Sequence, residues 1–180
     1  MTGRLGLISV LACGVLACGS ALWAQDIPAG KGPGSYVAVG ATFSDYNSDY
    51  GKRDLAGATV FVDANVYNRF GLEAEGRRLQ FHSDDGTKLS TYLGGPRFSR
   101  DFRSFRPYTK FLAGRGEFDF PYGYAKGTYF MVAAGAGLDW RIGNRLFVRV
   151  IDFEYQRWSQ FTFGNLTPYG ISTGLSFRVF

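Results

Sequence analysis

The heptapeptide GLSFRVF, residues 174–180, ends the chain and decides the fold that the sequence predicts. Leu175, Phe177 and Val179 alternate in it with two polar residues, and Phe180 follows as the last residue. A free C-terminus usually frays into solvent, whereas strict alternation is typical of a β-strand with two different faces. We therefore interpret this end as the last strand of a closed sheet, held along both of its edges.

The first 24 residues have the pattern of a secretory signal peptide. A single basic residue, Arg4, precedes an apolar stretch that runs from Leu5 to Leu22, and the small residue Ala24 precedes a polar segment. A membrane helix needs ~20 consecutive apolar residues, and several glycines interrupt this stretch. The segment VLAC before and including Cys18 loosely resembles a lipobox, so lipidation of this cysteine stays open as an alternative.

Removal of residues 1–24 would leave about 156 residues, enough for one domain. Both cysteines, Cys13 and Cys18, lie in the removed segment, so disulfide bonds and thiol-ligated metals are not expected. Without Arg4 the chain has 19 lysines and arginines against 15 acidic residues, with no run of basic residues. This weak excess does not indicate nucleic acid as a partner.

Alternation with a period of two recurs throughout the rest of the chain, and helical periodicity is absent. Polar segments rich in Gly, Asn or Asp separate the alternating segments, as is typical of strands and turns. Eight strands are predicted, at residues 36–44, 56–66, 70–79, 88–99, 105–116, 128–141, 146–157 and 167–180.

The connections between these strands alternate in length. Those after the second, fourth and sixth strands are tight turns, whereas those after the first, third, fifth and seventh are long and polar or aromatic. Antiparallel strands that run up and down place all odd connections at one end. Short turns at one end and long loops at the other are typical of outer-membrane barrels. The sequence thus predicts an all-β, eight-stranded antiparallel up-and-down transmembrane β-barrel.

The two faces of the strands support a membrane location. Val37, Val60 and Val132 belong to apolar faces, and we expect these faces to contact lipid while small and charged side chains fill the lumen. The predicted lumen charge network consists of Glu73, Glu75, Arg77, Arg97, Lys110, Asp139 and Arg178.

One strand does not fit this scheme. Arg149 lies on the opposite face from Asp152 and Glu154 if the strand at 146–157 is regular. Either one of these groups faces lipid or a β-bulge intervenes, and the sequence leaves both open.

The end of the chain also has the spacing of an assembly signal. Ser172, Gly174, Phe177 and Val179 recur at positions that resemble the C-terminal signal read by the barrel-assembly machinery, although Phe180 places the terminal aromatic residue one position further.

The segments YLGGPRFS, RPYTKFLAGRG, AAGAGLDWRI and RLFVRVIDFEY resemble the successive hairpins of small outer-membrane β-barrel proteins of the OmpA-like transmembrane superfamily. This resemblance implies a monomeric barrel in outer-membrane lipid and lipopolysaccharide, with both termini in the periplasm. The expected domains are a signal peptide at 1–24, a short periplasmic segment at 25–34 and the barrel at 35–180.

A structural or surface-interaction role is the function we expect for such a barrel. Eight strands leave a lumen that side chains can fill, so the lumen should be closed or very narrow. Partners would meet aromatic residues of the long loops: Tyr46, Tyr50, Phe118, Phe120, Tyr122, Tyr124, Trp158, Phe161 and Phe163. The same residues could instead form the interfacial aromatic girdle.

Two other functions are weighed against this one. A soluble lipocalin-like ligand binder would need an apolar lumen. A lipid A-modifying enzyme would need a catalytic pair, but His82 and Ser83 are adjacent and so would point to opposite faces of a strand. The pair Asp84 and Asp85 offers too few ligands for a metal site. We therefore expect no catalytic residues, no cofactor and no metal.

Overall fold

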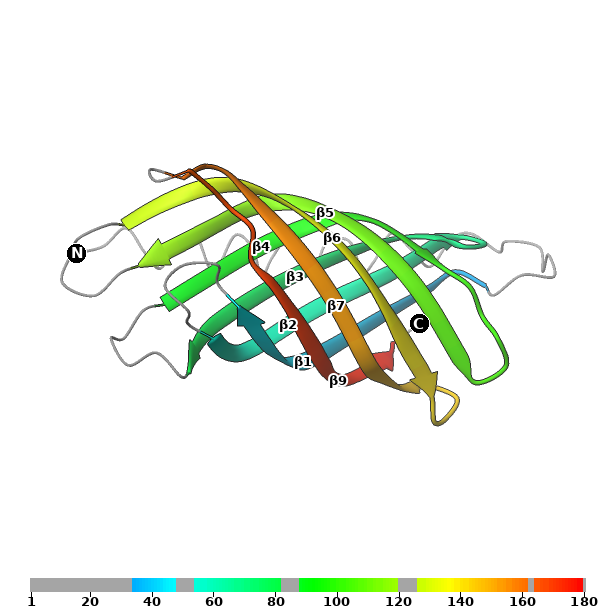
Figure 1. Cartoon of the computed structure of the whole chain (residues 1–180). Coiled ribbons are helices and arrows are strands. Elements are labelled where there is room, and N and C mark those ends of the chain that lie inside the picture. Colours follow the sequence, from blue (N-terminus) through cyan, green and yellow to red (C-terminus); the bar gives the residue numbers. More distant parts are fainter. Residues whose placement is uncertain (1–33, 48–53, 82–87, 120–125, 162–163, 180) are drawn as a thin grey trace, which may run out of the picture. The chain divides into compact units, whose positions relative to one another are not determined.

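The computed structural model describes residues 34–47, 54–81, 88–119, 126–161 and 164–179. Within these residues no helix is long and apolar enough to cross a bilayer. The strands, drawn in Figure 1, are β1 (Tyr36–Asn47), β2 (Asp54–Tyr67), β3 (Phe70–Phe81), β4 (Lys88–Ser99), β5 (Phe105–Asp119), β6 (Lys126–Arg141), β7 (Leu146–Phe161), β8 (Gly164–Leu166) and β9 (Tyr169–Arg178).

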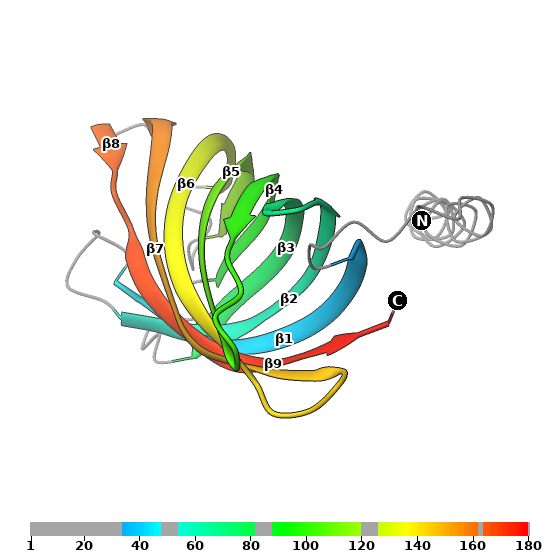
Figure 2. The same ribbon diagram turned by 90° about the vertical axis from the view of Figure 1, so that its right-hand side faces the viewer.

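The strands form one closed antiparallel sheet. Each of β1 to β6 pairs with the next strand in the chain. Strand β7 pairs with β9, and β9 pairs with β1, which closes the sheet. Figure 2 shows the strands curving around a common lumen, with β1 beside β9. The predicted eight-stranded up-and-down barrel is confirmed.

The eighth predicted strand, residues 167–180, starts earlier than expected and is interrupted. Both β8 and β9 pair with β7, so they act as one strand of the barrel with a break at Thr167 and Pro168. Proline has no N–H to donate to a neighbouring strand. Its carbonyl oxygen still accepts a hydrogen bond from the Gln156 N–H, at 2.7 Å.

The last described residues are bonded on both sides. Strand β9 pairs with β1 from Tyr169 opposite Asn47 to Arg178 opposite Ala38. Beyond it the Val179 N–H donates to the Val37 carbonyl at 2.8 Å. On the other side, Arg178 N–H donates to the Arg145 carbonyl at 2.7 Å. The chain end is therefore the strand that closes the sheet, and Phe180 lies outside the described residues.

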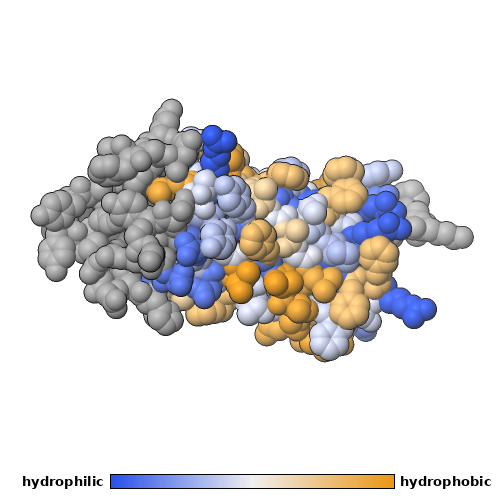
Figure 3. Space-filling view, viewed as in Figure 1, coloured by the Kyte–Doolittle hydropathy of each residue, from blue (hydrophilic) through white to orange (hydrophobic). Residues whose placement is uncertain are grey.

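Apolar side chains point outward from the barrel wall. Val60 is 62% exposed and Val132 is 41% exposed, whereas Glu73 and Arg97 are each 1% exposed. Figure 3 shows hydrophobic residues gathered over the middle of one face, with hydrophilic residues toward its ends. A water-soluble barrel would have the opposite distribution, so the lipocalin-like alternative does not fit this wall.

The apolar belt has the height of a bilayer core. On β5 the outward residues run from Phe105, near a short turn, to Arg115, which carries the first outward charge along the strand. Ten residues at a rise of ~3.3 Å span ~33 Å along a strand. A strand tilt of about 40° reduces this to a height of ~25 Å, which is that of the apolar band of outer-membrane barrels.

A β-bulge in β7 settles the conflict between Arg149 and Asp152. In the pairing with β9 the register shifts between Arg149 and Asp152. In the pairing with β6, Arg149 lies opposite Asp139 and Ile151 lies opposite Leu138, so Val150 is the extra residue. Val150 and Ile151 are consecutive, yet both are exposed on the outer wall. The extra residue brings Arg149, Asp152 and Glu154 into the lumen together, so no charge of this strand segment faces lipid.

Deletion of Val150 should prevent the barrel from folding. Without the bulge the strand is regular, so either Arg149 or both Asp152 and Glu154 must turn toward lipid. We expect the deletion variant to lose the difference in gel migration between unheated and heated samples that a folded barrel shows. The substitution Val150→Ala, which keeps the residue count, should retain that difference. A deletion variant that migrates like the wild type would show that the bulge is dispensable.

Candidate functional site

Ten charged side chains meet in the lumen. Each is at most 5% exposed, and together they come from six consecutive strands, β2 to β7. The residues are Asp63, Glu73, Glu75, Arg77, Arg97, Lys110, Asp139, Arg149, Asp152 and Glu154. Buried charges require partners, and the distances show that these ten supply one another. We call them the lumen network.

Arg97 lies at the centre of one half of the network. Its guanidinium donates to Asp63 at 2.5 Å, to Glu73 at 2.9 Å and to Asp139 at 2.6 Å. These carboxylates come from β2, β3 and β6, so the side chain of Arg97 on β4 links opposite parts of the wall. Arg149 joins the same group through Glu73 at 3.1 Å and Asp139 at 3.3 Å.

Lys110 lies at the centre of the other half. Its Nζ atom is 3.3 Å from Glu73, 3.0 Å from Glu75, 2.7 Å from Asp152 and 2.9 Å from Glu154. One ammonium group therefore neutralises part of the charge of four carboxylates. Glu73 contacts both Lys110 and Arg97, so it joins the two halves.

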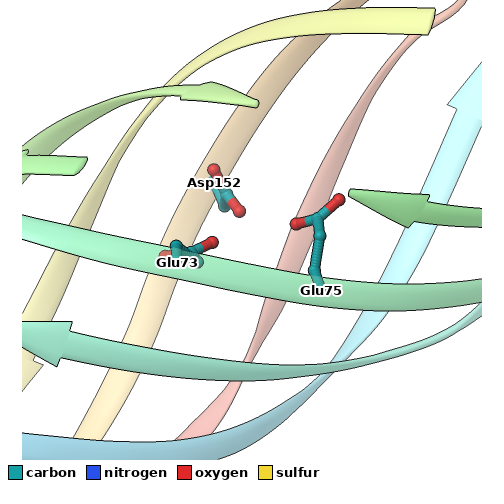
Figure 4. Close-up of side chains that lie close together, drawn as sticks. All are labelled: Glu73, Glu75 and Asp152. Carbon is teal, nitrogen blue, oxygen red and sulfur yellow. The ribbon is translucent and has the colours of Figure 1, made fainter. Parts of the chain in front are cut away.

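Three of these carboxylates have the spacing of a metal site. Oxygen atoms of Glu73, Glu75 and Asp152 lie within 4.8 Å of one another, and Figure 4 shows the three side chains converging from β3 and β7. The ammonium group of Lys110 already contacts all three. A divalent cation would be held beside this positive charge, so the donor set fits an ion pair better than a metal ion.

Aromatic rings support the guanidinium groups. Arg97 lies 3.8 Å from the ring centroid of Tyr108, and Arg149 lies 3.7 Å from that of Phe61. Arg77 lies 4.2 Å from the ring centroid of Tyr46 and also bonds to Glu75 and Glu154, at 2.8 and 2.9 Å. Such contacts are worth more when the cation is desolvated, as it is here.

The structure adds four residues to the predicted set: Asp63, Arg149, Asp152 and Glu154. Alternation in the strand at 56–66 places Asp63 opposite the valines, so that signal was present in the sequence. The other three could not be assigned because the bulge in β7 changes the alternation between Arg149 and Asp152.

Arg178 does not join the lumen network. It lies near the short turns, half-buried, with its guanidinium over the rings of Tyr36 and Phe147 at 4.4 and 5.2 Å. Arg106 packs on the same two rings and pairs with Asp101 at 2.5 Å. The alternation correctly directs Arg178 inward, but β9 pairs it with Ala38 at the end of the barrel, away from the central carboxylates.

An apolar layer fills the lumen toward the long connections. Its members are Leu55, Leu79, Leu89, Leu93, Leu112, Met131, Ala133 and Leu166, with Tyr46 and Trp158 among them. The sequence predicts only small and charged residues inside, so this layer corrects that expectation. It was missed because each strand contributes only one or two such residues. Four of them, Tyr46, Leu55, Trp158 and Leu166, also lie beyond the predicted strand ends.

Tyr46 and Trp158 were expected in surface loops but are only 1% exposed. The Tyr46 hydroxyl donates to Glu154 at 3.2 Å, and Trp158 Nε1 donates to Gln156 at 3.1 Å. A side chain at Gly116 would collide with the Trp158 ring. The two aromatic residues thus connect the apolar layer to the lumen network.

The sequence model of the outer membrane protein beta-barrel domain matches residues 10–178. The chain belongs to this family. Outer-membrane barrels of solved structure share its fold, among them Neisserial surface protein A (NspA), with 15% identity over 81% of this chain and 97% of that chain and a TM-score of 0.61. The N-terminal β-barrel domain of Pseudomonas aeruginosa OprF has 14% identity over 81% of this chain and 99% of that one, with a TM-score of 0.54.

At such identities the likeness to solved structures concerns the fold alone. No curated protein matches the sequence. Family membership makes this an outer-membrane β-barrel protein, in agreement with the apolar wall and the closed sheet.

The residues of the predicted assembly signal occupy two faces of this outer-membrane β-barrel. Ser172 is buried and donates to the Ser44 hydroxyl at 2.8 Å, and Gly174 lies against the backbone of β1, where a side chain would collide. Phe177 and Val179 are 46% and 57% exposed on the outer wall. Their role in assembly stays a prediction.

Several expectations fall on residues that the structure does not describe. These residues are His82, Ser83, Asp84 and Asp85, and the loop aromatics Tyr50, Phe120, Tyr122, Tyr124 and Phe163. The side chains of Phe118 and Phe161 also lie outside the description.

Substitution of Lys110 by Met should destabilise the outer-membrane β-barrel by about 3–5 kcal/mol, because four buried carboxylates lose their common cation. Urea titration of the folded protein, followed by tryptophan fluorescence, would measure the free energy of unfolding. Lys88→Met, at an exposed position, is the matched control and should change little. Equal effects of the two substitutions would contradict the geometry described for Lys110.

Proposed function

We propose that this protein is a structural or surface-interaction barrel of the outer membrane with a closed or very narrow lumen. The observation that carries the proposal is that side chains from six strands meet across the lumen while the wall presents an apolar belt. What remains to contact other molecules is the wall itself and the long connections.

Passage through the lumen would meet two obstacles in series. A permeating ion would first have to separate ion pairs such as those of Arg97 and Lys110, and leaving a buried charge without its partner is costly. It would then meet the apolar layer around Leu79 and Met131, both 0% exposed, whose aliphatic side chains do not replace its hydration water.

We propose no enzymatic activity for this barrel. The carboxylates of the lumen network are held in ion pairs and lie in the lumen rather than at an accessible surface. A reactive group would need access to a substrate and freedom to exchange a proton, and both conditions are unmet for these residues.

The proposed partners are outer-membrane lipid with lipopolysaccharide and, during insertion, the barrel-assembly machinery. Phe177 and Val179 support the second proposal because they lie outward on the closing strand, where another protein could contact them before closure. We further propose that the barrel is monomeric, with both termini in the periplasm and the connections after β1, β3, β5 and β7 outside the cell.

Surface proteolysis of intact cells tests the orientation. Proteinase K should cut in the long connections at 48–53, 82–87 and 120–125 and spare the short turns at 101–104 and 142–145, because only the former would face the medium. Fragments identified by mass spectrometry would locate the cuts, and permeabilised cells provide the control in which both ends are accessible. Cleavage confined to the short turns of intact cells would reverse the orientation.

Planar-bilayer recordings test the lumen. The purified, folded barrel should show no large steady conductance, because charged and apolar side chains occupy the lumen in successive layers. The double substitution Leu79→Ala and Met131→Ala removes part of the apolar layer and serves as a comparison in which brief openings should become more frequent. A stable large conductance of the wild-type protein would overturn the closed-lumen proposal.

A further inference from the structure

A groove of about 490 Å³ runs across the outer wall from β4 to β7. Its base consists of small residues, Gly94, Ala113 and Ala134, and larger side chains border it. The lining residues that point outward are Gly94, Pro96, Phe111, Ala113, Val132, Ala134, Tyr155 and Arg157. Its volume lies within the range of ~300–1,000 Å³ found for small-molecule sites.

The strand register shows that the groove spans two neighbouring rows of outward residues. In one row Ala113 pairs with Gly94 on one side and Val132 on the other, and Val132 pairs with Arg157. In the other row Phe111 pairs with Ala134, which pairs with Tyr155. Phe111 is 65% exposed and Tyr155 is 45% exposed, so two aromatic side chains stand above a base of small residues.

Two arginines lie at the end of the groove that faces the long connections. Arg157 lies in the groove itself, and Arg115 pairs with Tyr92 and Phe130 one row closer to the long connections. Both side chains are exposed on the outer wall, and Arg115 lies 5.6 Å from the ring centroid of Tyr92. Among the side chains that the structure describes, no carboxylate forms an ion pair with either arginine.

This position is unfavourable for a cation unless an anion meets it. Arg115 pairs with Phe130, and Arg157 pairs with Val132. Both partners are exposed apolar residues of the wall, so the two arginines lie at the edge of the apolar belt. An outward arginine in that region must extend toward the headgroups or bind a negatively charged group there. A phosphate held by two arginines is a favourable solution, because guanidinium groups bind phosphate oxygens through paired hydrogen bonds.

We propose that the groove binds lipid A, the phosphorylated and acylated anchor of lipopolysaccharide. A phosphate group bridges Arg115 and Arg157, and an acyl chain lies over Gly94, Ala113 and Ala134 between the two aromatic side chains. This inference deepens the proposed function and rests on its orientation, in which the long connections lie on the outer side. A phosphomonoester carries close to two negative charges, which matches two arginines better than the single charge of a phospholipid diester.

A second copy of the chain fits the groove less well. Two barrels in one membrane are related by an axis along the membrane normal, so a symmetric contact through this face would place equal heights opposite each other. Arg115 and Arg157 of one copy would then approach the same arginines of the other, and like charges repel. The charge pattern therefore favours an anionic lipid over self-association.

Native mass spectrometry of the folded mature barrel in neutral detergent tests the proposal, with purified lipid A, phosphatidylglycerol and phosphatidylcholine as probes. We expect lipid A to bind at least tenfold more tightly than either phospholipid. The double substitution Arg115→Gln and Arg157→Gln should weaken lipid A binding at least tenfold. Ala113→Leu, which fills the groove with an apolar side chain and changes no charge, should weaken it several-fold.

Matched controls separate the groove from the rest of the wall. Arg78→Gln removes an exposed outward arginine of β3, and Ala58→Leu enlarges an exposed alanine of β2; both lie outside the groove and should leave lipid A binding within twofold of the wild type. The difference in migration between unheated and heated samples confirms that each variant is folded.

Three results would overturn the assignment of this groove to lipid A. These are an equal loss of binding in Arg78→Gln, unchanged binding in Ala113→Leu, and equal affinity for phosphatidylglycerol. A dimer that disappears in Ala113→Leu would assign the groove to self-association instead. Surface proteolysis reports the orientation independently of lipid binding. If the long connections are cut from outside but lipid A does not bind, the lipid A site is refuted and the proposed function stands.

Discussion

Complete pairing of backbone hydrogen-bonding groups is the constraint on which the rest of this structure depends. Hydrocarbon offers no water to an unpaired N–H or carbonyl group, so a sheet in a bilayer must close. Here the closing contact is made by β9 with β1, and it extends to Val179, one residue beyond the end of the strand. The alternation at the end of the sequence has its explanation in this contact, because both edges of the last strand are occupied.

Closure around eight strands fixes what the interior can contain. The lumen is only wide enough for side chains that meet at its centre. Here they are charged in one layer and mostly apolar in the next, toward the long connections. Residues at the outward positions contact lipid and are therefore mostly apolar. The charged residues of the membrane-spanning part point inward, where they must neutralise one another. Arg97 and Lys110 each contact three or more carboxylates, an arrangement in which removal of one cation affects several strands at once.

Alternation in the sequence was sufficient to predict the number of strands, their direction and the faces of residues such as Val60, Glu73 and Arg97, because a barrel in lipid imposes opposite polarity on its two faces. It was insufficient in β7, where Arg149 and Asp152 lie on one face only because Val150 and Ile151 form a bulge. It also failed at the loop ends of the strands. There Tyr46 and Trp158 continue the strands inward instead of forming loops, and residue type alone does not distinguish an interior aromatic residue from one in the interfacial girdle.

The lumen network draws its residues from β2 to β7 and none from the two strands of the closing contact. At that contact the interior holds hydroxyl groups, with Ser44 bonded to both Thr59 and Ser172 at 2.8 Å. Every interior carboxylate and its cation thus belong to a consecutive run of the chain that precedes β9. The carboxylates of the lumen network can therefore pair with their cations before the last strand closes the sheet. Among the residues of β9 only Arg178, half-buried over Tyr36 and Phe147 near the short turns, carries a charge toward the interior during closure.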